Sequence, residues 1–333
     1  MKVAVIGLGY WGPNLVRNFL GTDGVKEVYA VDVNETRLFQ VSKRLPGAKF
    51  EKDFEKLLDS VDVDAVVIAT PVSSHYSLAK KALEAGKHVL VEKPLTSSVA
   101  QADELCALAA GRNLVLMVDH TFVYTGAVRK IKEIIESGDV GDLFYFDSVR
   151  VNLGLFQHDV NVIWDLATHD VSIMDYLIDK KPVAVSAYGT SHYNHVEDVA
   201  YVVVKFPDNL IAHFHVNWLA PVKVRQILIG GQKRMILYDD VEPSEKVKVY
   251  DKGVDIKTRE GIYQTLIQYR TGDMFAPKLD GTEALAALCA NFISSIQGKS
   301  KPQSDGQSGL NVVRILEAAN KSIRQNGKDI LLD

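Results

Sequence analysis

The first 120 residues alternate short apolar runs with segments of helical pattern, and this alternation limits the possible folds more than any other feature of the chain. The predicted strands are residues 3–6, 28–31, 65–69, 89–91 and 114–118, and the predicted helices are residues 13–19, 54–58, 77–85 and 99–110. Strands that are apolar along their whole length are typical of a parallel sheet covered on both faces. The alternation therefore predicts a doubly wound α/β domain.

Beyond Thr125 the pattern changes from this alternation to a series of strands. After a helix at residues 127–136, a strand at 143–153 and a helix at 160–177, strands follow at residues 183–188, 198–206, 210–219, 224–229, 234–238 and 246–250. Within residues 210–218 the apolar side chains at even positions alternate with a mixed set, which predicts one buried face and one mixed face. We therefore expect an α+β domain with a large, mostly antiparallel and open-faced sheet.

These patterns indicate two domains, and the length of the chain allows each domain to bury a core of its own. We place the first domain at residues 1–122 and the second at residues 123–333. Two final helices, residues 282–296 and 310–324, flank a loop rich in Ser, Gln, Gly and Pro, and the last of them can pack back on the first domain.

The composition excludes several kinds of partner. The formal net charge of −4 predicts no general attraction to nucleic acid or to an anionic membrane. Glycines interrupt the apolar run at the start of the chain, and no stretch approaches the roughly 18 uncharged apolar residues of a membrane span. Cys106 and Cys289 lie in apolar helical patterns, which predicts buried free thiols and a reducing compartment. We expect a soluble protein of the cytoplasm.

A glycine-rich run, Gly-Leu-Gly-Tyr-Trp-Gly, follows the first predicted strand and opens the first predicted helix. Gly7 permits a tight turn, Gly9 lets the backbone approach a pyrophosphate, and Gly12 allows close packing of helix on strand. Asp32 ends the second strand, 20 residues after Gly12, where a carboxylate hydrogen-bonds a ribose 2′-hydroxyl. The context predicts a Rossmann domain that binds NAD in preference to NADP, although Arg37 can soften the preference. A glycine turn of another α/β protein is the alternative.

Three polar side chains form the predicted catalytic set. Lys93 lies in Glu92-Lys93-Pro94 at the end of the fifth strand, at the edge where open α/β sheets bind their ligands. Asp165 and His169 are four residues apart on a predicted helix, away from its apolar stripe. Histidine can accept a hydroxyl proton near neutral pH, and a neighbouring carboxylate can orient it. Alone, such a pair usually marks a solvated helix face, so Lys93 and the dinucleotide motif carry much of the argument.

At this point the sequence resembles the glucose–fructose oxidoreductase and inositol dehydrogenase family over nearly its whole length. The motifs that carry the resemblance are the glycine run, Ala69-Thr70-Pro71 with His75, Glu92-Lys93-Pro94, and Asp165 with His169. The resemblance implies that the three predicted catalytic residues are the catalytic set of the family. Together with the glycine run it implies a set of cofactor contacts, namely Gly7, Gly9, Tyr10, Trp11, Gly12, Asp32, Thr70, Pro71, His75, Glu92, His120 and Trp164.

Within that family, residues 9–14, 151–154 and 238–240 resemble a branch encoded in surface-polysaccharide pathways. Members of the branch oxidise or reduce nucleotide-linked sugars, often at C3 of a hexosamine or its uronic acid. Candidate sugar or phosphate contacts are Arg150, Asn152, His158, Asn161, Tyr263, Tyr269 and Arg270, each of which an exposed edge or loop explains equally well.

The resemblance also implies a homodimer or homotetramer in which the open sheet face packs against another subunit. His213 and His215 would then lie at an interface, because no further ligand with suitable spacing accompanies them to form a metal site.

The predicted reaction removes a hydride from a secondary carbinol carbon to C4 of the nicotinamide, while His169 accepts the hydroxyl proton and the Lys93 ammonium stabilises the alkoxide. The sequence leaves open whether Lys93 or His169 is the base. Three other functions remain as alternatives: a dehydrogenase of a free polyol or sugar of the inositol or glucose type, a glycoside hydrolase that retains NAD, and an NAD-sensing regulatory protein. The exact sugar, the carbon oxidised and the direction are not encoded in these motifs.

Overall fold

The computed structural model describes residues 1–154, 160–193, 195–258 and 265–332, and it divides the chain into two compact units. The first unit consists of Met1–Thr125 and Thr282–Arg314, and the second consists of Gly126–Gly281 and Ile315–Asp333. Among the described residues, no helix combines the length and the apolar character needed to cross a membrane.

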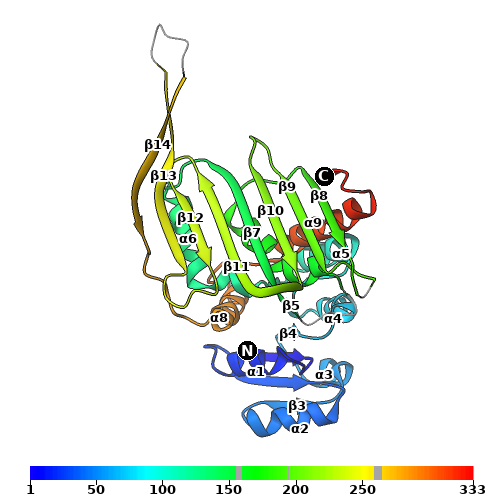
Figure 1. Ribbon diagram of the computed structural model, residues 1–333. Helices are drawn as coiled ribbons and strands as arrows, with labels where there is room; N and C mark the ends of the chain where they lie inside the picture. Colours follow the sequence, from blue (N-terminus) through cyan, green and yellow to red (C-terminus); the bar gives the residue numbers. More distant parts are fainter. Residues whose placement is uncertain (155–159, 194, 259–264, 333) are drawn as a thin grey trace. The chain divides into compact units, whose positions relative to one another are not determined.

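The first unit is built on a six-stranded parallel sheet with the order β3-β2-β1-β4-β5-β6 (Figure 1). Its strands are β1 Lys2–Ile6, β2 Glu27–Val31, β3 Lys49–Glu51, β4 Ala65–Ile68, β5 His88–Glu92 and β6 Leu116–Asp119. Its helices are α1 Gly12–Leu20, α2 Glu35–Arg44, α3 Phe54–Ser60, α4 Val72–Glu84, α5 Val99–Gly111, the 3₁₀ turn η1 Thr121–Tyr124, α8 Ala284–Ile296 and the first part of α9 Gly306–Arg324. The doubly wound prediction is confirmed, and the strand order reverses between β1 and β4, where such sheets bind their ligands.

The sequence patterns do not predict two elements of this unit, strand β3 and helix α2. Strand β3 has only three residues, and helix α2 buries only Val41. Neither element therefore has the apolar periodicity by which strands and helices are recognised. The side chain of Asn34 accepts the Arg37 N–H at 3.2 Å and caps α2, so the start of this helix is fixed locally instead.

The second unit is built on a nine-stranded sheet with the order β14-β13-β12-β11-β7-β10-β9-β8-β15 (Figure 1). The strands are β7 Leu143–Leu153, β8 Ala184–Thr190, β9 Val199–Lys205, β10 Ile211–Asn217, β11 Leu219–Gly231, β12 Met235–Asp239, β13 Val247–Thr258, β14 Thr265–Phe275 and β15 Ile330–Leu331. All neighbours are antiparallel except β7 and β10, so the prediction of a mostly antiparallel sheet is confirmed. The helices of this unit are α6 Gly126–Glu136, the π turn η2 Ile163–Ala167, α7 Thr168–Leu177 and the end of α9.

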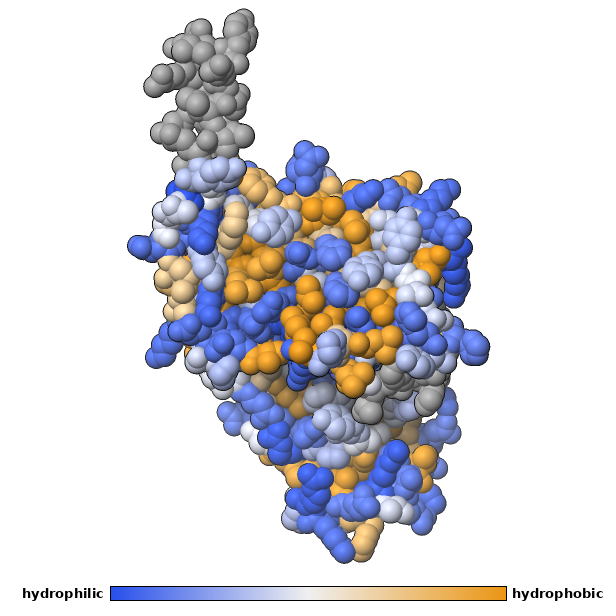
Figure 2. All heavy atoms as spheres, in the orientation of Figure 1, coloured by the Kyte–Doolittle hydropathy of each residue, from blue (hydrophilic) through white to orange (hydrophobic). Residues whose placement is uncertain are grey.

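One face of this large sheet is covered and the other is open. In β10 the side chains of Ala212, Phe214 and Val216 are fully buried, as their alternation predicts. The opposite face carries large apolar side chains that remain exposed, namely Tyr188, Tyr201, Ile211 and Leu228. Figure 2 shows hydrophobic patches between polar ones over this face. We refer to it below as the open face.

Candidate functional site

The loop between β1 and α1 has the geometry of a phosphate-binding turn. Gly7 has a φ of +92°, which favours glycine, and a Cβ on Gly12 would lie 1.9 Å from the Gly7 carbonyl oxygen. A Cβ on Gly9 would instead meet nothing within 4 Å, so this part of the loop faces open space. Helix α1 begins without a side-chain cap and without an acidic residue in its first turn. Its positive end is therefore available to a diphosphate, and the loop fits the cofactor that the sequence predicts.

The two aromatic residues of this loop lie on its solvent side. Tyr10 and Trp11 are both exposed, and their rings meet edge to face with centroids 5.1 Å apart.

Asp32 lies directly after β2 and is held in a defined orientation. One carboxylate oxygen accepts the Leu8 N–H at 2.7 Å, and the other accepts the Asn34 N–H at 2.8 Å. Each oxygen retains a lone pair that can accept a ribose hydroxyl. The Arg37 guanidinium is 3.6 Å from the carboxylate and is more than half exposed, so a cation lies beside Asp32.

His75 connects the two loops that follow β4 and β5. Its Nδ1 is 2.9 Å from the Pro94 carbonyl oxygen, and its Nε2 is 2.8 Å from the Thr70 carbonyl oxygen. Burial lowers the pKa of His75, while its two carbonyl partners oppose that shift. Because both ring nitrogens face protein carbonyls, His75 holds Thr70, Pro71 and the lysine loop in position instead of offering a free nitrogen.

A buried pair of carboxyl groups lies beside the predicted catalytic lysine. Glu92 and Asp119 are partners in register at the ends of β5 and β6, and both are buried. Burial and the charge of Asp119 raise the pKa of Glu92 well above its usual value, and burial likewise raises the pKa of Asp119. The Lys93 ammonium opposes both shifts. Two adjacent buried carboxyl groups cannot both ionise easily, so the pair retains a proton at pH values where an exposed pair would not.

His120 follows this pair and has no partner for either ring nitrogen among the described residues, although its side chain is almost fully buried. Burial lowers the pKa of His120 to about 3, and the charge of Lys93 acts in the same direction. The ring is therefore neutral near pH 7. Buried polar groups are nearly always hydrogen-bonded, so an orphaned imidazole at the carboxyl end of β6 indicates a ligand partner. This fits a role along the cofactor.

In the second unit, Asp165 lies in the π turn η2 and His169 lies in the first turn of α7. The helix predicted for residues 160–177 is present from residue 162, but it takes the wider π geometry over Ile163–Ala167. The apolar residues keep helical spacing across the π turn, so the sequence pattern does not reveal the wider turn. Thr168 Oγ1 donates to the Trp164 carbonyl oxygen at 2.6 Å within this segment, and the Trp164 side chain is buried. Isolated π turns occur frequently at functional sites.

Asp165 has a partner that the sequence analysis missed. The indole Nε1–H of Trp218 donates to Asp165 Oδ2 at 3.1 Å. In the sequence Trp218 is only the last member of the buried apolar row of residues 210–218. The available signal is its chemistry, since a buried indole N–H requires an acceptor.

Arg150 is part of the interior and not of a sugar-binding surface. Its Nε and Nη2 donate to the two oxygens of Asp170 at 2.9 and 2.6 Å, and the exposed fractions of the two residues are 3% and 2%. The interpretation of Arg150 as a sugar contact is therefore corrected. Asp170 directly follows His169, so this ion pair fixes the first turn of α7 to strand β7.

Among the other candidate sugar contacts, some are hydrogen-bonded within the protein and others are exposed. The Asn161 amide donates to Glu197 at 2.7 Å and to Asn320 at 2.9 Å, and Arg270 Nε donates to Asp251 at 2.9 Å, so both are engaged within the protein. Asn152 in β7 is partly exposed, and Tyr269 in β14 is strongly exposed. His158 and Tyr263 lie outside the described residues.

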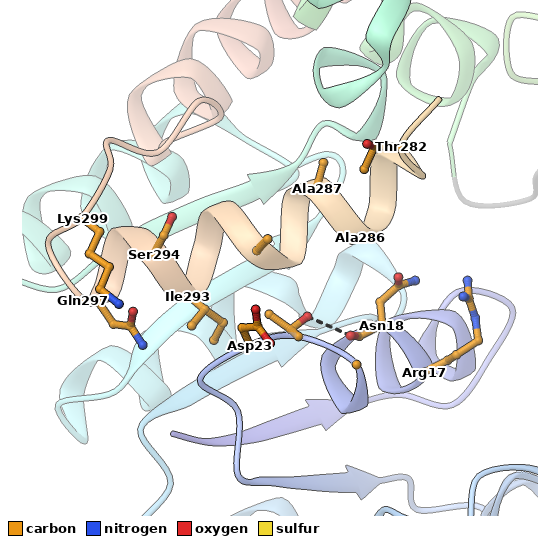
Figure 3. A pocket seen from close by; sticks show the side chains of 13 residues that line it. Arg17, Asn18, Asp23, Thr282, Ala286, Ala287, Ile293, Ser294, Gln297 and Lys299 are labelled. Atoms are coloured by element: carbon orange, nitrogen blue, oxygen red, sulfur yellow. Dashed lines mark hydrogen bonds between the residues drawn. The ribbon is translucent and has the colours of Figure 1, made fainter. Parts of the chain in front are cut away.

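A cavity and the two cysteines of the chain lie outside the predicted set of site residues, and no metal site is found among the described residues. A cavity of about 600 Å³ lies between α1 and α8, where Figure 3 shows Asn18, Asp23, Ile293 and Gln297, and none of the predicted site residues lines it. Within the part of the chain that the structure describes, no group of three His, Cys, Asp or Glu side chains is arranged to hold a metal ion. Cys289 is buried as predicted, whereas Cys106 is only partly buried; both are free thiols.

A doubly wound sheet with an uncapped glycine turn at its switch point and an acidic residue after β2 defines a dinucleotide-binding domain of the kind that oxidoreductases use. Comparison with known proteins specifies it further. Residues 1–120 match the oxidoreductase family with an NAD-binding Rossmann fold, and residues 128–237 match the GFO/IDH/MocA C-terminal domain. The chain belongs to the GFO/IDH/MocA family of oxidoreductases.

Individual relatives match the chain over nearly its whole length. The UDP-N-acetylglucosamine 3-dehydrogenase of Acidithiobacillus ferrooxidans is 28% identical over 96% of this chain and 95% of its own. The myo-inositol 2-dehydrogenase of Thermotoga maritima is 26% identical over 98% and 97%. A solved structure of the Acidithiobacillus ferrooxidans enzyme superimposes with a TM-score of 0.80 at 25% identity, covering 98% of each chain. The chain is an NAD-dependent dehydrogenase, and the two relatives above are named for a nucleotide sugar and for a polyol.

Proposed function

We propose that the protein transfers a hydride between NAD and a secondary hydroxyl of a nucleotide-linked sugar, with C3 of a hexosamine or its uronic acid as the reacting position. The observation that carries the proposal is the match to a UDP-N-acetylglucosamine 3-dehydrogenase over 96% of this chain. The proposed place of the reaction is the synthesis of a surface polysaccharide, in agreement with the resemblance of residues 9–14, 151–154 and 238–240.

The proposed catalytic set is Lys93, Asp165 and His169. Bound NAD supplies the hydride acceptor at C4 of the nicotinamide. His169 accepts the proton of the sugar hydroxyl, and Asp165 orients His169 or binds a neighbouring hydroxyl. The Lys93 ammonium stabilises the developing alkoxide. The buried pair of Glu92 and Asp119 lies beside this lysine, whose charge opposes the rise in both of their pKa values.

A thermal-shift titration of the NAD-saturated protein tests the substrate class. One ligand set contains UDP-linked hexosamines and their uronic acids, and the other contains free polyols and hexoses. A ligand at about 100 times its dissociation constant adds roughly 2.7 kcal/mol to the free energy of unfolding, which is easily detected. We expect stabilisation by the nucleotide sugars, and stabilisation by free polyols alone would overturn the proposal.

A dehydrogenase of a free polyol is the second candidate, because the inositol dehydrogenase of Thermotoga maritima matches 98% of this chain. The same titration separates the two, since a free polyol carries no nucleotide and no diphosphate. A glycoside hydrolase that retains NAD would release a free sugar without net reduction of NAD, and absorbance at 340 nm distinguishes it directly from a dehydrogenase.

We further propose that the protein is a homodimer or homotetramer that assembles through the open face. Four large side chains of this face, Tyr188, Tyr201, Ile211 and Leu228, are between 43% and 63% exposed. Large exposed apolar side chains gathered on one face of a sheet favour an interaction site there. His213 lies on the same face and pairs with Asp147 at 2.7 Å, and Tyr201 stacks on His215.

A cytoplasmic location is part of the same proposal. NAD and nucleotide-linked sugars are intracellular metabolites, and Cys106 and Cys289 are free thiols, as expected in a reducing compartment. Fractionation of cells that express the tagged chain tests this, with the protein expected in the soluble cytoplasmic fraction and its recovery from an extracellular or periplasmic fraction contradicting it.

A further inference from the structure

Trp218 occupies a fixed position between strands β10 and β11. Its side chain is 1% exposed. Its N–H donates to the Asp198 carbonyl oxygen at 2.9 Å, and its own carbonyl oxygen accepts the Gly154 N–H at 3.0 Å. With both backbone groups bonded and the ring enclosed, the direction of the indole is determined by the sheet.

The indole N–H is directed at one oxygen of Asp165, with 3.1 Å between Trp218 Nε1 and Asp165 Oδ2. Asp165 is only partly buried and lies in the π turn, whose wider geometry departs from an ordinary helix. The contact therefore connects a rigid strand end to a carboxylate that its own helical segment holds less regularly.

A tryptophan has a chemical advantage in this position. Its N–H only donates and does not titrate, so it orients the carboxylate at every pH without competing for the transferred proton. A histidine or a tyrosine in its place would introduce a further ionisable group.

Gly154 leaves room for the indole. A Cβ on Gly154 would lie 3.0 Å from Trp218 Cδ1, the carbon bonded to the donating nitrogen. A methyl group there would tilt the ring and redirect its N–H, while the donor itself is retained.

We propose that Trp218 is a positioning residue of the proton-transfer site, which fixes through its indole N–H the carboxylate of Asp165, four residues before His169. The inference rests on the proposed function, because it assigns a role to Trp218 through Asp165 and His169. Trp218 itself does not touch the reacting atoms.

Trp218→Phe is the first test, since phenylalanine keeps an aromatic ring and removes the donor. We expect kcat to fall about 10-fold, less than the roughly 10²–10⁴-fold loss that follows removal of a proton acceptor. KM for NAD should not change. The acidic limb of the pH profile of kcat/KM, which reports the proton acceptor, should move, because the neighbouring carboxylate is no longer held in one orientation. An unchanged kcat together with an unchanged pH profile would overturn the proposal.

Controls separate positioning from a general loss of structure. Phe214→Leu alters a fully buried aromatic residue of the same row in β10 and should lower Tm without moving the pH profile. In an Asp165→Asn background, Trp218→Phe should cause little further loss of kcat, whereas an equal loss in both backgrounds would contradict the coupling. If Trp218→Phe does not fold, Gly154→Ala provides the second variant and should move the same acidic limb.

A measurement without substrate distinguishes this inference from the proposed function. The imidazole titration of His169 can be followed by NMR, with His169→Asn for assignment, in the wild-type protein and in Trp218→Phe. A shifted midpoint in the variant supports the role of Trp218 even if no sugar is oxidised, in which case only the proposed function fails. An unshifted midpoint overturns the role of Trp218 even if the wild-type protein is fully active.

Discussion

Single side chains at strand ends define most of the chemistry of the first unit. Glu92 and Asp119 end two neighbouring parallel strands, and His120 follows them with both ring nitrogens unpartnered among the described residues. Buried polar groups of this kind destabilise a folded protein unless a ligand or a shared proton compensates for their burial. The carboxyl pair and the histidine therefore give measurable signatures before any substrate is known.

Glu92→Gln should stabilise the protein in the absence of NAD, and increasingly so as the pH rises. Burial first, and the charge of Asp119 second, raise the pKa of Glu92 above its ordinary value of 4.5. The contribution of this group to stability is therefore fully present below about pH 4.5 and is lost as the pH rises towards the raised pKa. Each pH unit between the unfolded-state and folded-state pKa values corresponds to about 1.4 kcal/mol of that contribution. Glutamine stays neutral, so differential scanning fluorimetry between pH 5 and pH 8 should show a growing Tm difference, and a constant difference would contradict the prediction.

His169→Ala should lower kcat by about 10²–10⁴-fold, because general base catalysis contributes about that much. The affinity for NAD, measured by calorimetry, should stay nearly unchanged. If turnover is unaffected, His169 is not the base and Lys93 becomes the candidate, which a Lys93→Met variant would then examine.

At the scale of elements, the attachment of helix α7 to strand β7 depends on one buried ion pair. Arg150 and Asp170 form a two-fold hydrogen-bonded contact in the interior of the second unit. Such pairs add little compared with an apolar pair, but the removal of one partner leaves an uncompensated buried charge.

Arg150→Met should therefore reduce the free energy of unfolding by about 3–5 kcal/mol. The double variant Arg150→Met with Asp170→Leu should recover much of this loss, since no lone charge then remains buried. Urea unfolding measures both. Equal destabilisation by the single and the double variant would indicate that packing, and not the unpaired carboxylate, determines the cost.

A comparison of single strands and helices explains why some of them can be predicted from the sequence and others cannot. Strand β10 alternates strictly, and Asp208 and Asn209 form its hairpin with φ values of 60°, so both the strand and the turn follow from residue types. Strand β3 and helix α2 carry little buried apolar surface and leave no such pattern. The π turn at Ile163–Ala167 depends on tertiary packing that periodicity does not report.

In the candidate site, too, some residues could be predicted from the sequence and others could not. The glycine turn, Asp32 and Lys93 could be located because their chemistry depends on their place after a strand. Arg150 and Trp218 could not be assigned, because an arginine on a strand and a tryptophan in an apolar row are explained equally well as surface and core. Only the positions of their partners, Asp170 and Asp165, determine their roles.

At the scale of the whole molecule, the open face should determine the state of association. Leu228→Glu places a charge in the middle of this exposed surface and should convert the proposed oligomer into smaller species in size-exclusion chromatography with light scattering. Phe39→Glu is the matched control, because Phe39 is a similarly exposed apolar residue on α2 of the first unit. A wild-type protein that is monomeric at micromolar concentration would contradict the proposed assembly.

The division of the chain between the two units also affects how such a protein can exchange modules. The dinucleotide unit is completed by Thr282–Arg314, where the Ser304 hydroxyl donates to the Val118 carbonyl oxygen at 2.6 Å and the Tyr124 hydroxyl donates to Asn291 at 3.0 Å. A single recombination event near residue 125 would separate β6 from these partners. Gene fusion or laboratory grafting of this unit onto a different catalytic partner would therefore require two crossover points, so inheritance of both units as one cassette is the simpler evolutionary route.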